Sequence, residues 1–184
     1  MERALAVANA IITIAFEKGI PPTQLKLQKL LYFAHGWHLV LYNEPLVDEN
    51  FQAYKSGPLI PSVYQVFKIY GSLGIFRPGS IRIDSLTPES EPLWETPEVV
   101  QREHVLPLVE LVWDIYGRFS ARALCELVQM ENTPWRVIWE QNKGTRDVEI
   151  PNDMIKAYFQ AVMDALIEKR ESRAAGEKAQ ADQS

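Results

Sequence analysis

The sequence of 184 residues is poor in cysteine, since Cys125 is the only one. A single cysteine forms no internal disulfide, and Cys125 has no CxxC companion, so the pattern fits a reducing compartment. The chain also has no excess of positive charge: 24 acidic residues outnumber 19 Lys and Arg, which gives a formal net charge of −5. Because non-specific nucleic-acid binding depends on a basic surface, this balance argues against nucleic acid as a partner.

Long apolar runs are also missing. The most apolar stretch, residues 30–41, is interrupted by two histidines and a glycine, and it is shorter than the roughly 20 residues that span a bilayer. Residues 1–19 look superficially like a signal sequence, but the acidic Glu2 and the polar Asn9 and Thr13 indicate an amphipathic helix instead. We therefore expect a cytoplasmic protein that makes no contact with a membrane.

The chain lacks the recognisable motifs of common enzymes. Its few glycines are scattered, and none of the dinucleotide-binding, P-loop, GxSxG, HExxH or EF-hand patterns occurs. The acidic residues converge on no evident acid–base pair. The sequence therefore predicts a protein that is not an enzyme and that uses no cofactor.

Two pairs of residues still have the side chains that reactive or metal-binding sites use. His35 and His38 lie three positions apart on one predicted helix, but a zinc site needs about four ligands and only two carboxylates are close in sequence. We interpret His35 as a hydrogen-bonded core residue and His38 as a residue at the solvated end of its helix, and we predict no metal site. Cys125 and His104 are the types of a nucleophile and its base, but apolar residues flank Cys125, which favours a small buried hydrophobe.

The length and the 47% of hydrophobic residues predict one globular domain. Its central element is predicted at residues 24–42, where apolar and aromatic side chains lie nearly all round the helix, as in a helix buried on most sides. Thr23 precedes this helix as an N-cap. Lys26 and Lys29 share one face, which we expect to be the solvated side of the first turns.

Hydrophobic periodicity and helix-breaking residues place the other helices. They are predicted at residues 2–18, 61–70, 97–117, 121–130, 134–142 and 152–170. Asn9 is expected on the polar side of the first of these. Thr96–Glu98 is expected to cap the helix at 97–117, and Pro107 to kink or split it.

The rest of the chain is predicted to be extended, looped or disordered. Residues 51–55 and 81–83 are expected to pair as a small β ribbon. Residues 84–96 form a loop that is the expected mobile or partner-contacting element, and residues 171–184 form a charged tail with too few apolar residues to order itself. The predicted fold class is mostly α, a single-domain helical bundle around a buried central helix.

Residues 25–71 carry a long pattern: a KLQKLLYFAHG helix, a PL turn, an FQAY strand, a GP pair, and a PSVY helix that ends in YG. In this pattern the chain resembles the Panacea domain, the SocA-like antitoxin family that also includes phage-associated GepA-like proteins. A weaker similarity lies in FSARALCELVQMENTPWRVIW, residues 119–139. The resemblance covers nearly all of the predicted folded part and implies a Panacea-like domain over residues 1–170.

One departure from the family pattern concerns Val128 and Gln129. They stand where the family usually has a Thr-His pair, five residues before the Pro-Trp that is Pro134 and Trp135 here. Any work that this histidine does in relatives is altered or absent in this chain.

The resemblance implies an antitoxin that neutralises a cognate toxin by direct protein–protein binding, and it brings no catalytic residue with it. One alternative is an adaptor that delivers its partner to an ATP-dependent protease, with residues 171–184 as a tether. Another is a DNA-binding regulator, whose basic residues at the ribbon would be Lys55, Lys68, Arg77 and Arg82.

Interface anchors tend to be aromatic or basic residues in partly exposed positions. On that basis we nominate residues outside the predicted core as the partner-binding surface. They are Tyr54, Lys55, Tyr64, Arg77 and Trp94.

Overall fold

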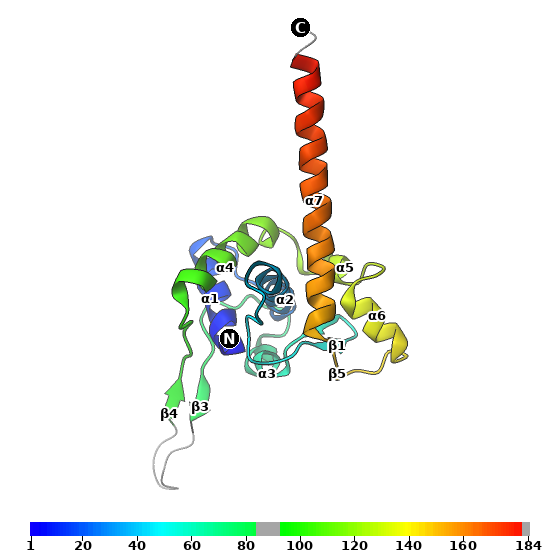
Figure 1. Ribbon diagram of the computed structural model, residues 1–184. Helices are drawn as coiled ribbons and strands as arrows, with labels where there is room; N and C mark the ends of the chain where they lie inside the picture. The colour runs from blue at the N-terminus through cyan, green and yellow to red at the C-terminus, as the bar shows by residue number, and fades with distance from the viewer. Residues whose placement is uncertain (84–92, 182–184) are drawn as a thin grey trace.

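The computed structural model describes residues 1–83 and 93–181 (Figure 1). Helix α2 (Gln24–Tyr42) lies at the centre of the body, where it contacts α1 (Ala4–Glu17), α4 (Arg102–Tyr116), α5 (Ala121–Val128) and α7 (Asn152–Ala181). Most of the described chain is helical, and its short strands pair antiparallel. The predicted mostly α fold around a buried central helix is therefore confirmed. Among the described residues, no helix is long and apolar enough to cross a membrane.

Apart from α7, the remaining helices and strands are short. The helices are α3 (Pro61–Phe67) with the 3-10 helix η1 (Lys68–Tyr70), α5 (Ala121–Val128), α6 (Pro134–Gln141) and α7 (Asn152–Ala181). The strands are β1 (Gln52–Tyr54), β2 (Gly57–Leu59), β3 (Ile81–Ile83), β4 (Leu93–Glu95) and β5 (Val148–Glu149).

Side-chain caps fix where several helices begin. Thr23, Ser120 and Thr133 each accept a hydrogen bond from the backbone N–H three positions later, at 3.3, 3.1 and 3.3 Å. Each bond satisfies an N–H that the first helical turn leaves unpaired. Helix α4 runs unbroken through Pro107, which therefore does not split it.

Helix α4 begins at Arg102, later than the predicted residue 97. The expected cap at Thr96–Glu98 does not form. Instead, the backbone just before α4 is bonded by a residue near the start of the chain. The buried Glu2 carboxylate accepts the N–H groups of Val100 and Gln101 at 2.8 and 2.6 Å. A carboxylate from another segment thus supplies the negative charge that a helix start favours.

The predicted pairing of 51–55 with 81–83 is wrong, although both pieces are extended. Strand β1 pairs with β2 in a tight hairpin and with β5 on its other side, while β3 pairs with β4. The strands of the β1–β2 pair and of the β3–β4 pair are closer in sequence than those of the predicted pair, so bringing them together costs less entropy. Strands β2 and β5 are too short to give an alternating pattern in the sequence.

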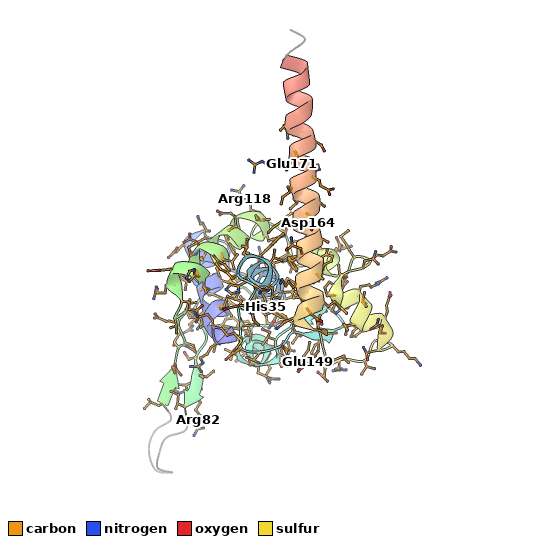
Figure 2. The ribbon with its side chains drawn as sticks, viewed as in Figure 1. His35, Arg82, Arg118, Glu149, Asp164 and Glu171 are labelled. Carbon is orange, nitrogen blue, oxygen red and sulfur yellow. The ribbon has the colours of Figure 1, made fainter. Side chains whose placement is uncertain are left out.

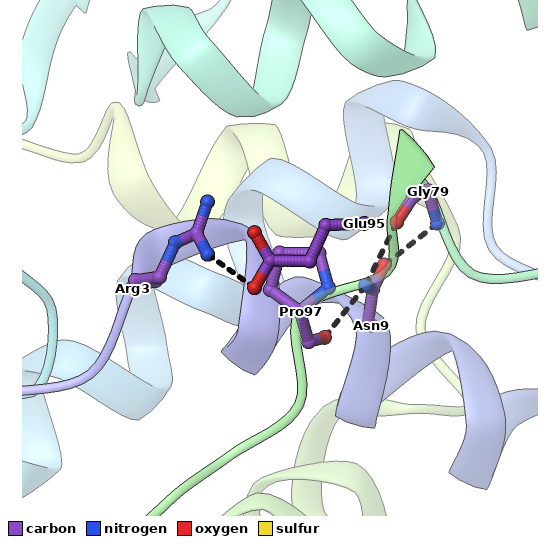
Figure 3. A network of polar contacts seen from close by, with 5 residues as sticks. All are labelled: Arg3, Asn9, Gly79, Glu95 and Pro97. Atoms are coloured by element: carbon purple, nitrogen blue, oxygen red, sulfur yellow. Dashed lines mark hydrogen bonds and ion pairs between the residues drawn. The ribbon is translucent and has the colours of Figure 1, made fainter. Parts of the chain in front are cut away.

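Asn9 fastens the base of the β3–β4 hairpin to α1 (Figure 3). Its Nδ2 donates to the carbonyls of Gly79 and Pro97, both at 3.0 Å, and its Oδ1 accepts the Gly79 N–H at 2.7 Å. Beside it Arg3 forms an ion pair with Glu95 at 2.8 Å. Asn9 is buried rather than solvated as predicted, because three backbone groups of the hairpin satisfy its amide.

Helix α7 packs beside α2 with its first turns and then extends away from the body (Figure 1). It continues to Ala181, beyond the predicted end at residue 170. Its last turns are rich in Ala, Glu, Lys, Arg and Gln, which favour the helix even without burial. The division into a domain at 1–170 and a tail at 171–184 stays a prediction. Residues 182–184 and most of the predicted loop at 84–96 lie outside the described residues.

Candidate functional site

A cleft of about 460 Å³ opens over the first turns of α2, and we call it the α2 cleft. Its walls are the turn between β1 and β2, the start of α3 and the segment before β5. Segments far apart in the sequence meet here, since β5 adds to the β1–β2 hairpin beside the first turns of α7 (Figure 1).

Lys29 forms the floor of the α2 cleft. Its side chain is 1% exposed, and its Nζ donates to the Pro58 carbonyl at 2.8 Å. Burial lowers the pKa of this amine to about 8. Gly57 has a φ of +107°, and a Cβ on it would lie 2.9 Å from the Lys29 Nζ, so the hairpin closes directly onto the amine.

Lys26 and Lys29 are thus both buried, which corrects the prediction of a solvated face. The Lys26 Nζ donates to the Gly117 carbonyl and lies 5.4 Å from the centre of the Trp113 ring. Carbonyls of other segments, one at Gly117 and one in β2, replace water around the two amines, and the spacing of residues within α2 does not indicate them.

Two glutamines complete the floor. Gln28 pairs with both backbone groups of Ile60, accepting its N–H at 2.9 Å and donating to its carbonyl at 3.3 Å. Gln24 is 9% exposed, and its Nε2 has no hydrogen-bond partner among the described residues. The cleft therefore holds one amide that is engaged and one that is not.

The rim of the α2 cleft carries aromatic and charged side chains. Tyr54 donates through its hydroxyl to the Asp147 carboxylate, and this bond raises the pKa of Tyr54. Lys55 and Arg146 are exposed, and Tyr64 is 39% exposed on the opposite wall. The rim thus presents two cations and two phenol rings, with its carboxylate already engaged.

Helices α5 and α6 hold the β1–β2 turn in place from behind. Gln129 donates from Nε2 to the Lys55 carbonyl at 3.1 Å, and Trp135 donates from Nε1 to the Tyr54 carbonyl at 2.8 Å. Val128 lies against the turn as well, 2.9 Å from where a Cβ on Gly57 would stand. The two positions that depart from the family pattern are therefore in contact with the hairpin.

The structure brings together three of the five nominated partner residues, Tyr54, Lys55 and Tyr64. Arg77 is exposed on the segment before β3, and Trp94 is 64% exposed on β4. Neither lines the α2 cleft.

The basic residues expected at a β ribbon do not all share one. Lys55 follows β1, whereas Arg82 lies on β3 in the other sheet, facing away from the body in Figure 2. Sequence reasoning missed the floor of the cleft altogether. The sequence feature that could have indicated this floor is the alternation of two glutamines and two lysines in the first turns of a largely apolar helix.

The histidines of α2 lie in the interior. His35 is fully buried, its Nε2 lies 2.8 Å from the Asn152 Oδ1, and burial lowers its pKa to about 4. The prediction of a hydrogen-bonded core histidine is confirmed. His38 is 4% exposed, with its Nδ1 2.7 Å from the Glu44 carbonyl, so it does not lie at a solvated helix end. Over residues 1–83 and 93–181 no three His, Cys, Asp or Glu side chains gather as metal ligands would.

Cys125 was predicted as a small buried hydrophobe, and the structure places it in a partly buried position. Burial raises the pKa of its thiol, and the nearby Lys29 opposes that shift only in part. A raised pKa disfavours the nucleophilic thiolate. His104 packs against the Tyr42 ring at 5.6 Å, and no hydrogen bond joins it to Cys125 among the described residues.

Two other cavities have different chemistry. One of about 330 Å³ lies between α1 and α4, and polar residues that line it, such as Asn9 and the Glu98–Arg102 pair, bond to one another or to the backbone. Another of about 150 Å³ is lined by aromatic rings of α2, α4 and α7, among them Tyr32, whose buried hydroxyl has no partner in the described part of the chain. The α2 cleft combines the larger space with unengaged donors.

Comparison with known proteins agrees with the similarity seen in residues 25–71. The family model described as "Antitoxin SocA-like, Panacea domain" matches residues 27–136. Among curated proteins, the Antitoxin SocA of Caulobacter vibrioides (strain NA1000 / CB15N) is 38% identical over 135 residues, which cover 73% of this chain and 69% of that protein. No solved structure matches the chain.

Proposed function

Because the chain belongs to the SocA-like antitoxin family with a Panacea domain, we propose that it is the antitoxin of a toxin–antitoxin system. In this proposal it neutralises a cognate toxin by direct contact in the cytoplasm, and it is not an enzyme. The family match carries the proposal. It runs from the first turns of α2 to the start of α6, the part of the chain that builds most of the α2 cleft.

The chemistry of the cleft supports binding rather than catalysis. Its floor offers an ammonium and two amides, its rim offers two cations and two tyrosines, and its one carboxylate is bonded to a phenol. A nucleophile with an adjacent base does not occur among these residues, whereas aromatic and basic side chains around a partly buried centre are typical of interface anchors.

A growth experiment tests the proposal. The small gene next to this one is induced in a bacterial host, with and without co-expression of this protein. We expect the neighbour alone to stop growth and co-expression to restore it, with the two proteins purifying as a complex. A harmless neighbour, or toxicity that co-expression leaves unchanged, would contradict the antitoxin function.

The projecting part of α7 favours one second candidate, the adaptor that delivers its partner to an ATP-dependent protease. Beyond the body this helix has exposed apolar side chains, with Leu166 57% and Ile167 49% exposed, which a protease component can contact. Truncation after residue 170 leaves those two side chains in place, and the double change Leu166→Ser/Ile167→Ser removes them. Neutralisation by contact should survive both changes, whereas delivery should fail in at least one and the toxin should then persist in the cell.

A further inference from the structure

We propose that the α2 cleft binds a carboxylate that the partner protein presents on an acidic side chain. This inference rests on the proposed antitoxin function and names the chemistry of the contact. It follows from the donors in the floor, the charge of the rim and the direction of α2.

The Lys29 amine is the first donor. An ammonium has three N–H bonds, and Lys29 uses one on the Pro58 carbonyl, with no second acceptor for it among the described residues. No carboxylate of the described chain lies within ion-pair distance of it, although the amine is almost completely buried. A buried cation is most stable when an anion and further hydrogen bonds surround it, so this floor is complementary to an incoming carboxylate.

The start of α2 supplies the second donor. Gln24 is more than nine-tenths buried, lines the cleft and has an unpartnered Nε2. It is also the first residue of α2, where the helix dipole is positive, and the first turn contains no acidic residue to balance that charge. A helix start with a buried, unpaired amide beside it favours a negative ligand.

The rim reverses the charge of the chain as a whole. Lys55 and Arg146 join Lys29 around the cleft, against the single carboxylate of Asp147, in a protein whose net charge is −5. Asp147 accepts a hydrogen bond from Tyr54, and within the described residues neither Lys55 nor Arg146 forms an ion pair with a carboxylate, so both cations are available to another anion. A singly charged carboxylate fits this set better than a phosphate dianion, which Asp147 would repel more strongly and which needs more donors than the floor offers.

The first test needs no toxin. The full-length chain, labelled with ¹⁵N, is titrated with N-acetylglutamate α-amide, whose only carboxylate is on the side chain, with the uncharged N-acetylglutamine α-amide, and with inorganic phosphate. We expect saturable shifts with N-acetylglutamate α-amide at the Gly57 N–H and the Gln24 side-chain amide. Equal shifts with N-acetylglutamine α-amide, shifts with phosphate alone, or no shifts in the cleft would overturn the proposal.

Charge reversal on the rim tests the site without disturbing the buried floor. The variant is Lys55→Glu/Arg146→Glu, and its matched control is Lys18→Glu/Arg118→Glu, which changes the net charge equally at exposed positions. Arg118 lies at the opposite end of the body from Glu149 of β5 (Figure 2). We expect the rim variant to bind N-acetylglutamate α-amide at least about tenfold more weakly and the control to bind it like the parent protein. Equal binding by both variants would contradict the site.

The same two variants are then measured with the product of the neighbouring gene. If co-expression rescues growth, the rim variant should bind that product at least about tenfold more weakly than the control, with the difference largest at low salt. Rescue with unchanged affinity in the rim variant would overturn the carboxylate contact and leave the antitoxin function standing. If the cleft binds the carboxylate probe but co-expression does not rescue growth, the antitoxin function is overturned and the carboxylate site stands.

Discussion

The first turns of α2 and its later turns are both buried, but different groups surround them. Residues 24–29 bury two glutamines and two lysines. Gln28 and both lysines donate to carbonyls of other segments, while the Nε2 of Gln24 has no partner among the described residues. From Leu31 to Leu39 the same helix buries rings and aliphatic side chains against α7 and α4. The contrast shows that a helix can be apolar on only part of its length and still lie at the centre of a fold, provided that backbone acceptors meet its polar side chains.

The later turns depend on tight packing between rings. The Tyr32 and Phe33 rings lie 5.8 and 6.2 Å from the Phe159 ring of α7 in edge-on contacts. Gly36 lets α7 come this close, because a Cβ there would stand 2.3 Å from the Phe159 ring. Where the polar turns leave a cleft, the aromatic turns leave no room for one more carbon at this position.

The largest expected effect comes from adding a side chain at Gly36, in the aromatic later turns of α2 (the aromatic end, residues 31–39). Gly36→Val forces α7 away from α2, and we expect the free energy of unfolding to fall by about 3 kcal/mol in urea titrations. Phe159→Leu in the same chain should recover part of that loss, because it makes space at the contact. A Gly36→Val protein as stable as the parent would show that the helices are not in contact as described.

His35 joins the aromatic end to the start of α7 through Asn152, and it should make the fold sensitive to acid. Its pKa falls from 6.5 to about 4 on folding, so the unfolded chain binds more protons between these values. The free energy of unfolding should therefore decrease by about 2 to 3 kcal/mol as the pH falls from 6.5 toward 4. In urea titrations at several pH values, the His35→Gln protein should lose much of this dependence of stability on pH. An unchanged dependence would show that other groups cause it, for example His38, whose pKa is also lowered.

Lys29, at the polar first turns of α2, should change stability with pH in the same direction as His35, but in the alkaline range. Burial lowers its pKa from 10.5 to about 8, so the unfolded chain binds more protons above pH 8 and stability should rise there. We expect a gain of about 2 kcal/mol by about pH 9.5, before tyrosines with raised pKa values reverse the trend. Cys125, whose pKa is raised, opposes the gain, so the contribution of Lys29 is the difference between the parent and Lys29→Met. If the free energies of unfolding of the two proteins change with pH in parallel, Lys29 makes no such contribution.

The smallest expected effect concerns the hydroxyl of Tyr32, which is buried without a partner in the described structure. Tyr32→Phe removes a polar group that folding strips of water, so the free energy of unfolding should rise by about 1 kcal/mol. Tyr116→Phe is the matched control, because the Tyr116 hydroxyl accepts a hydrogen bond from Trp37 at 3.2 Å and its loss should destabilise. A Tyr32→Phe protein that is less stable than the parent would reveal a partner for that hydroxyl.

Helix positions were predictable because their signals are local. The bounds of α2, its Thr23 cap, and the Ser120 and Thr133 caps follow from residues within one turn of each helix start. The start of α4 was not predictable in this way, since the carboxylate that organises it belongs to Glu2, which lies 98 and 99 positions before the two residues it bonds.

The residues of the candidate site likewise fall into those that local sequence features indicate and those that depend on distant segments. Tyr54, Lys55 and Tyr64 could be nominated because exposed aromatic and basic residues stand out in a sequence. Lys29 and Gln24 were missed, since a lysine and a glutamine near a helix start are ordinarily solvated. Nothing near them in the sequence announces the hairpin that covers them.

The sequence by itself determined the helices, most of their caps, the central place of α2 and the membership of an antitoxin family. Only the tertiary structure decided which strands pair, that the polar face of α2 is covered, and that a cleft with a buried ammonium lies there. The physical reason is range: propensity, capping and periodicity act within a few residues, whereas the burial of Lys29 depends on a carbonyl at Pro58 that the fold brings to it.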